Sequence, residues 1–372
     1  MPGPRDPSGV AAPKPDRTTA KADRAVPEAD RTAPKVDRPS GRPPAMTDVA
    51  RLAGVSHQTV SRVLNNHPSV REATRDRVAV AIQELEYRRN SAARTLVTGR
   101  SQTIGVISFD TTLYGPASTL FGIELAAREA GYFVAIASLK AIDRASVVEA
   151  YEMLMNQSVG GIIVIAPTAP VAMALQNLPP SFPVVAVEGG AAASLPVVAV
   201  DQVTGAKLAT QHLLDHGHRT VWHVTGPGDW LEAADRESGW RAALEAAGAP
   251  APPTLDGDWS PRAGYAAGRM LAARDDVTAV FVANDQMALG LLRAMHEAGR
   301  RVPNDVSVVG FDDVPEAAYF MPPLTTIRQD FAEVGRRSLA LLLQRLDSLS
   351  GPAERQIVPP ELVARDSVAP PP

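Results

Sequence analysis

Residues 47–66, TDVARLAGVSHQTVSRVLNN, predict two short helices joined by a tight turn. Thr47 is expected to cap the first helix with its hydroxyl group. Gly54 is expected to end it, because a residue without a Cβ atom adopts the left-handed conformation of a sharp turn. Ser56 is the expected cap of the second helix. The apolar positions that would pack between the helices are Val49, Ala50, Leu52, Ala53, Val60, Val63 and Leu64.

The second helix leaves a polar face exposed near its N-terminal end. This face carries His57, Gln58, Ser61 and Arg62. Gln and Arg side chains make paired hydrogen bonds to adenine and guanine edges, and a short helix fits the major groove of DNA. The stretch therefore predicts a helix-turn-helix that reads DNA bases, with an ordinary αα-hairpin as the alternative.

The composition provides ample material for a buried core. The 372 residues suggest two or three domains, and 45% of them are apolar while 5% are aromatic. No run approaches the ~18–20 apolar residues of a membrane span, and the N-terminus has no apolar signal segment. Without cysteine there is no disulfide, thiolate metal site or cysteine nucleophile. We therefore expect a cytoplasmic protein with no membrane partner.

The net charge of −4 is distributed unevenly along the chain. Residues 1–44 carry a net charge of +3, residues 45–100 carry +4, and the remainder carries −11. A small basic module on a larger acidic body favours a polyanionic partner that is bound by the module alone.

Residues 1–44 contain a seven-residue repeat, in which KPDR, KADR, EADR and KVDR begin at positions 14, 21, 28 and 35. The period is that of a coiled coil, but the repeat has no apolar seam and its prolines interrupt any helix. We expect a disordered tail, whose charges could add a weak non-specific contact with DNA.

A third helix is expected over residues 70–87, with Thr74 as its cap. The positions that recur at helical spacing and would close a three-helix core are Val78, Ile82 and Leu85. Residues 45–89 would then form a DNA-binding headpiece. The next stretch, residues 90–101, is rich in Arg and poor in apolar residues. It favours a hinge helix that folds only on DNA beside a second copy of itself, with a plain linker as the alternative.

From residue 102 the pattern changes to short Val/Ile runs, each followed by a helical stretch. Continuous rather than alternating hydrophobicity is typical of parallel strands that are buried on both faces. The expected strands are 104–108, 133–138, 161–166, 184–188, 197–201, 221–226, 279–284 and 306–313. Expected helices between them include 116–130, 204–216, 233–247, 261–273 and 285–298. Eight such units exceed a comfortable single sheet, so residues 102–372 predict an α/β core of two lobes with helices on both sheet faces.

Polar side chains follow several of these strands, at the edge where ligands bind in parallel sheets. They are Asp110, Glu188, Asp201, Asn284, Asp285, Asp312 and Asp313. Carboxylates and amides pair with sugar hydroxyls, and aromatic rings cover the apolar faces of a sugar ring. The rings placed in loops or at element starts are Tyr114, Trp230, Trp259 and Phe331. Each residue alone has a packing or capping role as its alternative, but their coincidence favours a pocket.

The helix-turn-helix followed by this core resembles the LacI/GalR family of transcriptional repressors over residues 45–368. The resemblance rests on the opening stretch, GDWS at 257–260, VANDQMALG at 282–290, VSVVGFDD at 306–313 and PPLTTIRQDF at 322–331. It implies a helix-turn-helix headpiece, a hinge helix and a periplasmic-binding-protein-like core whose two lobes close on an effector. We therefore expect a homodimeric repressor on double-stranded, pseudo-palindromic operator DNA.

The resemblance also implies which residues contact DNA. His57, Gln58 and Arg62 occupy the positions that read bases, and Leu96 occupies that of the hinge leucine that wedges into the minor groove. The remaining expected contacts are Thr47, Ser56, Thr59, Ser61, Asn65, Asn90 and Ala93.

In the core, the resemblance implies an effector site. The expected contacts are Leu113, Pro116, Glu188, Trp230, Arg236, Trp259, Asn284, Asp312, Gln329 and Phe331. Glu188 replaces an aspartate of one well-known member, and Trp230 and Glu232 replace two serines, which makes this wall bulkier and more acidic. These departures leave a sugar or polyol as the expected effector and count against a simple galactoside. The chain also ends without the leucine-heptad tail of tetrameric members, which favours a dimer.

Other classes fit the sequence less well. A dehydrogenase needs a Gly-x-Gly-x-x-Gly turn, and the nearest candidate, GPGDWL, has Leu231 at the third glycine, so we expect no enzyme and no cofactor. A metal site at His212, His216, His218 and His223 is not expected, because Gly217 ends the helix between the two pairs. A solute-binding protein would need a signal peptide and no basic headpiece. A purine nucleobase is the alternative effector.

Overall fold

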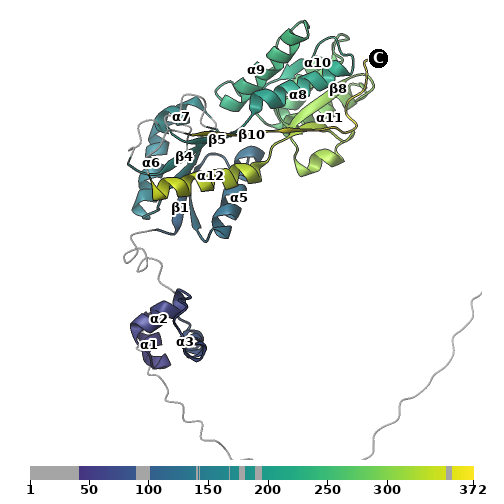
Figure 1. The fold of residues 1–372 in the computed structure, drawn as a ribbon. Coiled ribbons are helices and arrows are strands. Elements are labelled where there is room, and N and C mark those ends of the chain that lie inside the picture. The colour runs from purple at the N-terminus through teal and green to yellow at the C-terminus, as the bar shows by residue number, and fades with distance from the viewer. Residues whose placement is uncertain are drawn as a thin grey trace, which may run out of the picture. The chain divides into compact units, whose positions relative to one another are not determined.

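The computed structural model describes residues 42–88, 101–139, 141, 143–166, 168–175, 181–188, 195–348 and 354–372. The chain forms two compact units, Met1–Asn90 and Ser91–Pro372 (Figure 1). Residues 1–41 of the tail expected over 1–44, and residues 90–100 of the hinge expected over 90–101, lie outside the described residues. In the part that is described, no helix is long and apolar enough to cross a membrane.

Within residues 42–88 the first unit contains α1 (Met46–Ala53), α2 (His57–Leu64) and α3 (Glu72–Glu84). Val49, Val60 and Val78 are fully buried and hold the helices together. Gly54 has a φ of 62° and ends α1 in the left-handed conformation. The Ser56 hydroxyl accepts a hydrogen bond from the Thr59 amide at 3.1 Å and caps α2. The predictions of a helix-turn-helix and a three-helix core are confirmed.

Two predicted caps of this unit are wrong. Helix α1 begins one residue before Thr47, and its first turn is closed by Asp48, whose carboxylate accepts from the Ala45 amide at 2.9 Å. Thr74 lies inside α3, which begins after Arg71. A threonine caps a helix only where its own backbone is extended, and here the extended residues are Ala45 and Arg71, which come earlier in the two helices.

The first lobe of the second unit contains a six-stranded parallel sheet with the order β10-β5-β4-β3-β1-β2. Its strands are β1 (Thr103–Ser108), β2 (Phe133–Ser138), β3 (Ile162–Ile165), β4 (Val184–Val187), β5 (Val197–Val200) and β10 (Arg355–Val358). Helices α5 (Tyr114–Glu129) and α12 (Phe331–Asp347) pack on one face, and α6 (Arg144–Asn156) and α7 (Ala169–Leu175) pack on the other. Burial on both faces explains the continuous Val/Ile runs of the inner strands β1, β3, β4 and β5, whereas the edge strand β2 carries such a run although it is largely exposed.

The second lobe contains a five-stranded sheet with the order β11-β9-β8-β7-β6, in which only β11 runs antiparallel to its neighbour. Its strands are β6 (Trp222–Val224), β7 (Ala279–Val282), β8 (Ser307–Asp312), β9 (Thr325–Arg328) and β11 (Glu361–Val363). Its helices are α8 (Gln202–Asp215), α9 (Leu231–Ala246), α10 (Pro261–Ala272), α11 (Asp285–Glu297) and the short 3-10 helix η1 (Pro315–Tyr319). The predicted two-lobed α/β core with parallel sheets is confirmed.

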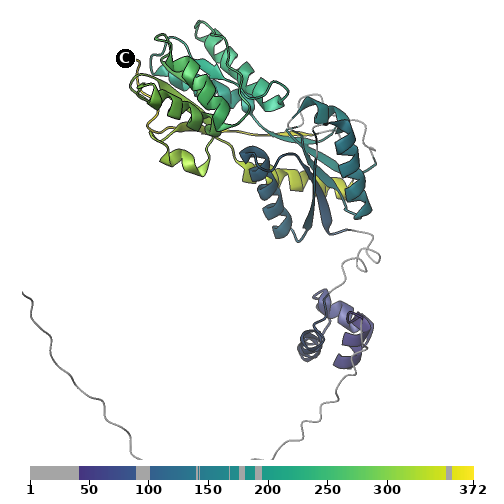
Figure 2. The same cartoon turned by 180° about the vertical axis from the view of Figure 1, so that it is seen from behind.

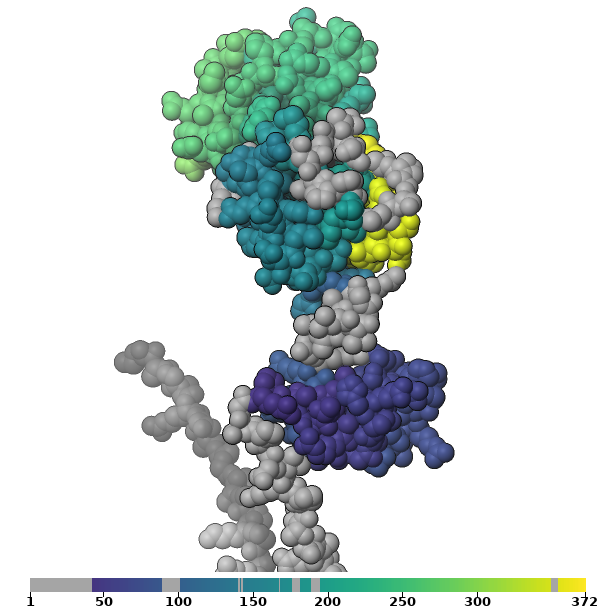
Figure 3. Space-filling view, turned by 90° about the vertical axis from the view of Figure 1, so that its left-hand side faces the viewer, coloured from purple at the N-terminus to yellow at the C-terminus, as the bar shows by residue number. Residues whose placement is uncertain are grey.

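The chain crosses between the lobes three times in the described part. It passes from β5 to α8, returns from β9 to α12, and passes again from β10 to β11 (Figure 2). In Figure 3 the yellow C-terminal residues lie beside the teal residues of the first lobe, to which α12 and β10 return. Because these crossings lie side by side, a change in the angle between the lobes must bend all of them.

Candidate functional site

A cavity of about 220 Å³ lies at the carboxyl ends of the strands and is lined by both lobes. The first lobe contributes residues 112–116 at the start of α5. Of the expected effector contacts, those that line the cavity are Leu113, Pro116, Trp230, Arg236, Trp259, Asn284, Asp312 and Gln329. Drug-sized ligands occupy pockets of roughly 300–1,000 Å³, so this cavity suits a ligand with a single ring.

The other two expected contacts lie beside the cavity and do not line it. The Glu188 carboxylate accepts a hydrogen bond from the Val200 amide at 2.8 Å, next to the first crossing between the lobes. The Phe331 ring packs edge-on against Tyr114, with ring centroids 5.9 Å apart. Phe331 therefore supports the first-lobe wall from behind.

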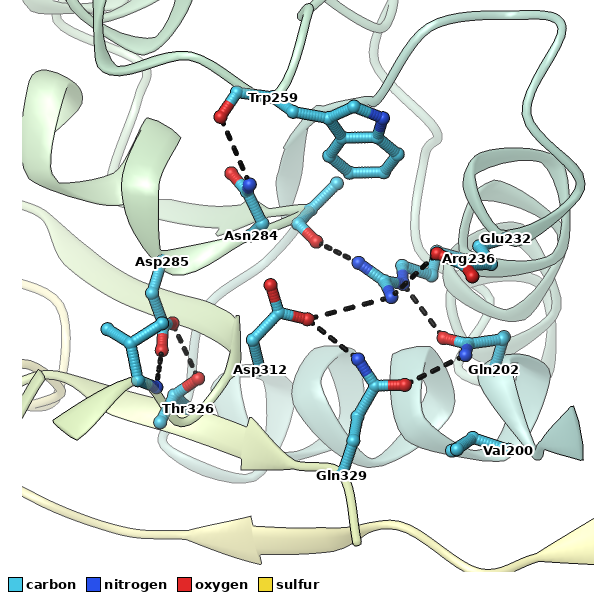
Figure 4. Close-up of polar contacts among 12 residues, drawn as sticks. Val200, Gln202, Glu232, Arg236, Trp259, Asn284, Asp285, Asp312, Thr326 and Gln329 are labelled. Atoms are coloured by element: carbon cyan, nitrogen blue, oxygen red, sulfur yellow. Dashed lines mark hydrogen bonds and ion pairs between the residues drawn. The ribbon is translucent and has the colours of Figure 1, made fainter. Parts of the chain in front are cut away.

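Arg236 lies at the centre of the site, with only 2% of its surface exposed (Figure 4). Its Nε donates to Gln202 at 2.9 Å and its Nη1 donates to the carbonyl of Ala283. The guanidinium lies 3.8 Å from the ring centroid of Phe311, a cation–π contact that fixes its plane. These contacts from α8, β7 and β8 hold the side chain rigidly without a ligand.

A buried chain of hydrogen bonds continues from Arg236 to the crossings between the lobes. The Gln202 amide donates to the Gln329 side chain at 2.9 Å, and the Gln329 amide donates to Asp312 at 2.7 Å (Figure 4). Gln202 begins the element after the first crossing, and Gln329 lies in the second. Gln202 was not among the predicted site residues, although its place directly after Asp201 at a strand end was an available signal.

Asn284 and Asp285 both have structural roles at the start of α11. The Asn284 side chain accepts from the Met287 amide at 2.9 Å and donates to the Trp259 carbonyl at 3.1 Å, so it is the N-cap of this helix. Asp285 is fully buried and accepts hydrogen bonds from Thr326 and the Val314 amide, at 2.6 and 2.9 Å. Asp285 thus joins α11 to β9 and does not line the cavity.

The carboxyl groups around the cavity have pKa values above their ordinary range. Burial raises the pKa of Asp312 to about 7, against the opposing charge of Arg236. Burial, and next the charge of Glu232, raise the pKa of Glu188 to about 8. Burial also raises the pKa of Glu232. Each of these acids loses hydration without gaining a hydrogen-bonded cation, which favours its neutral form.

These raised pKa values predict that the free energy of unfolding decreases as the pH rises. Asp312 and Glu188 bind protons more tightly in the folded than in the unfolded chain, so the stability from protonation is lost as the pH passes about 7 and 8. We expect the Tm of the ligand-free chain to fall from about pH 6.5, above which most histidines are neutral, to about pH 8, and to level off at higher pH. Thermal unfolding of Glu188→Gln checks this, because its Tm should fall less; an equal slope in both proteins would contradict it.

The four histidines considered for a metal do not converge. Gly217 has a φ of 96° and ends α8 after His216, which sends His218 and His223 onward. His218 bonds to Thr278 and to the Ala369 carbonyl, and His223 is buried in the second lobe. No group of three metal-ligating side chains lies together in the described ranges.

On the first unit, the structure places the expected base-reading side chains on one exposed helix. His57, Gln58 and Arg62 on α2 are exposed, as are Thr47, Ser56 and Asn65, while Thr59 and Ser61 are half-buried. Val60 is the buried residue of α2, so the polar face of this helix is free to enter a groove of DNA. Asn90, Ala93 and Leu96 lie outside the described residues.

Two family descriptions match the chain. Residues 45–90 match "Bacterial regulatory proteins, lacI family", and residues 210–368 match "Periplasmic binding protein-like domain". The chain is 33% identical to the lactose operon repressor of Escherichia coli K12 over 332 residues, which cover 89% of this chain and 92% of that protein. It is also 33% identical to the ribose operon repressor of the same strain over 327 residues, 87% of this chain and 99% of that protein.

A solved structure agrees with these similarities. The lac repressor dimer bound to operator and the anti-inducer ONPF superposes with a TM-score of 0.79 at 33% identity. The match covers 88% of this chain and 100% of that chain. Similarity therefore extends over the headpiece and both lobes.

Proposed function

The chain belongs to the LacI family of bacterial regulatory proteins, and we propose that it is a non-enzymatic, effector-controlled transcriptional repressor that binds operator DNA as a homodimer. The observation that carries this proposal is the presence, in one chain, of an exposed helix bearing Gln58 and Arg62 and a two-lobed pocket. An enzyme or a solute-binding protein would have no use for the first of these.

Apolar side chains exposed on both lobes support the dimer. On the first lobe, Phe133 and Ile136 lie on the edge strand β2 and are 78% and 49% exposed, and Phe121 on α5 is 61% exposed. On the second lobe, Met270 on α10 and Leu289 on α11 are exposed. A second copy packed against these elements would remove the exposed apolar side chains from water.

The effector that we propose is a sugar or polyol. Asp312, Arg236 and Gln329 offer directional acceptors and donors to hydroxyl groups. The Trp230 and Trp259 rings meet edge to face, at an interplanar angle of 70°, and so do not form the parallel pair that would sandwich a purine. The two repressors above are named for the lactose operon and the ribose operon, and both names refer to sugars, which supports this class.

Control by the effector follows from the crossings between the lobes. A ligand held by residues 112–116 of one lobe and Arg236 of the other favours one angle between the lobes. The Gln202–Gln329 bond lies at two of the crossings and would change with this angle. A coupling between effector and operator requires that the effector binds the DNA-bound and free forms with different affinity.

Replacing Arg62 with alanine tests the base-reading role. A sequence enriched from a random DNA pool by the purified protein serves as the operator. We expect Arg62→Ala to lose roughly 1–3 kcal/mol of binding free energy on this operator and much less on random DNA, because a paired base contact is removed. Fluorescence anisotropy at fixed salt measures both affinities. An equal loss on both DNAs would show that Arg62 contacts only phosphates.

A further inference from the structure

The cavity is lined by more carboxyl groups than cations. Among its lining residues, Glu232 and Asp312 are acids and Arg236 is the cation. Glu188 lies close behind, near enough for the charge of Glu232 to raise its pKa. Burial favours the neutral form of both lining acids, and if both were ionised, one negative charge would remain without a counter-charge in the cavity wall.

Arg236 does not neutralise these acids through hydrogen bonds. Its Nε and Nη1 donate to neutral acceptors, and its Nη2 lies 3.7 Å from an oxygen of Glu232 and 3.7 Å from an oxygen of Asp312. Both distances exceed that of a charge-assisted hydrogen bond, about 2.7–2.9 Å. Within the described residues, one oxygen of Asp312 accepts from Gln329, and Glu232 receives no hydrogen bond. The acids therefore retain acceptor capacity for a ligand.

Aromatic rings form the wall beside these acids. Trp230 directly precedes α9 and Glu232 lies in its first turn, so the two side chains come from one short segment. The Trp230 and Trp259 rings lie 5.5 Å apart, and both line the cavity with Tyr114. Ring faces attract cations, and carboxylates attract the same groups more strongly. Together they are the chemistry that recognises a protonated amine.

An anionic ligand does not fit this arrangement. A phosphate or carboxylate group would approach Glu232 and Asp312 in a buried site where like charges repel strongly, with only Arg236 to offset them. A neutral sugar brings no charge that would favour ionisation of the two acids. A ligand that carries one positive charge brings the ionised cavity to neutrality.

We propose that the effector carries a protonated amine on a single ring, as in an amino sugar or an aminocyclitol, and that Glu232 selects this amine. The inference rests on the proposed function, because it takes the cavity to be the effector site. It goes beyond that function by naming the charge of the effector and the side chain, Glu232, that binds the charged group.

The test compares matched ligands on the purified full chain by thermal shift near neutral pH. Each pair is a neutral sugar and its 2-amino counterpart: glucose with glucosamine, galactose with galactosamine, and mannose with mannosamine; myo-inositol with its amino derivative extends the panel, and glucuronate is the anionic probe. We expect at least one amine to bind about tenfold tighter than its neutral partner, a difference of about 1.4 kcal/mol. Glucuronate should bind more weakly than either.

The Glu232→Gln variant should bind the amine and its neutral partner equally, because glutamine keeps the length of the side chain and removes its charge. Glu237→Gln is the matched control, since Glu237 lies on the same helix, outside the cavity and paired with Arg241. The control should keep the amine preference. The wild-type comparison needs no variant, so it holds even if Glu232→Gln folds poorly.

Two further outcomes separate this inference from the function on which it rests. Tighter binding of neutral sugars, or an amine preference that persists in Glu232→Gln, overturns the inference and leaves a sugar-responsive repressor. No binding by any amine, neutral sugar or polyol overturns both.

Discussion

Replacing Arg236 with alanine should abolish effector binding and lower the free energy of unfolding of the core by about 3–5 kcal/mol, as expected when one partner of a buried charged cluster is removed. The side chain is 2% exposed and bonds to Gln202 and to the Ala283 carbonyl. Its removal leaves these acceptors without a donor, takes away the positive charge beside Asp312, and opens a space against the Phe311 ring. Urea unfolding followed by circular dichroism measures the loss.

Two variants show which property of Arg236 matters. Arg236→Lys keeps the charge but not the planar fork, so it should regain part of the stability and little of the effector affinity. Arg241→Ala, on the exposed side of the same helix and paired with Glu237, should change stability by about 1 kcal/mol or less. If Arg236→Ala destabilised the chain no more than Arg241→Ala, Arg236 would not hold the site together.

Sequence patterns were sufficient to predict those elements whose structure is decided by neighbouring residues alone. Continuous Val/Ile runs identified the strands buried on both faces, and Gly54 and Ser56 identified the turn of the headpiece. The sequence did not predict β9, β10 and β11: β9 is an inner strand without a Val/Ile run, and β10 and β11 are short edge strands that also lack one. Thr47 and Thr74 were predicted as caps because residue type alone does not determine where extended backbone ends.

Some residues of the site could likewise be predicted from the sequence, and others could not. Asp312 could be predicted because it ends a strand, and Arg236 was implied by the family resemblance alone; both line the cavity. The role of Gln202 depends on Gln329, 127 residues away, so no local pattern contains it. Glu188 was expected at a strand end and is found there, but its φ of 60° and its bond to the Val200 amide place it beside the cavity. Side-chain direction at a strand end is thus set by tertiary contacts that the sequence does not display.

The close packing of α10 against α11 makes Gly290 the position where the smallest substitution should have a large effect. A Cβ atom on Gly290 would collide with the carbonyl oxygen of Pro261 and lie 2.7 Å from the backbone nitrogen of Tyr265. Both atoms belong to the backbone of α10, so no side-chain rotation relieves the contact. The helices must move apart, and Pro261, which lines the cavity beside Trp259, must move with them.

Two effects of opposite sign decide the outcome of Gly290→Ala. Alanine favours a helix over glycine by about 1 kcal/mol. Overpacking against backbone costs about 4 kcal/mol, above the usual range for core side chains. We therefore expect a net loss of about 3 kcal/mol in the free energy of unfolding, together with weaker effector binding, since the wall formed by Trp259 and Asn284 is displaced.

Gly228→Ala is the matched control for this substitution. Gly228 lies in the same lobe, in the loop before α9, and a Cβ atom there would meet nothing within 4 Å. Its alanine variant should be neutral or stabilising by a few tenths of a kcal/mol, through a smaller entropy of the unfolded chain. Urea unfolding of both variants makes the comparison. If Gly290→Ala were as stable as Gly228→Ala, α10 and α11 could separate freely, and the rigid second-lobe wall on which effector recognition depends would not exist.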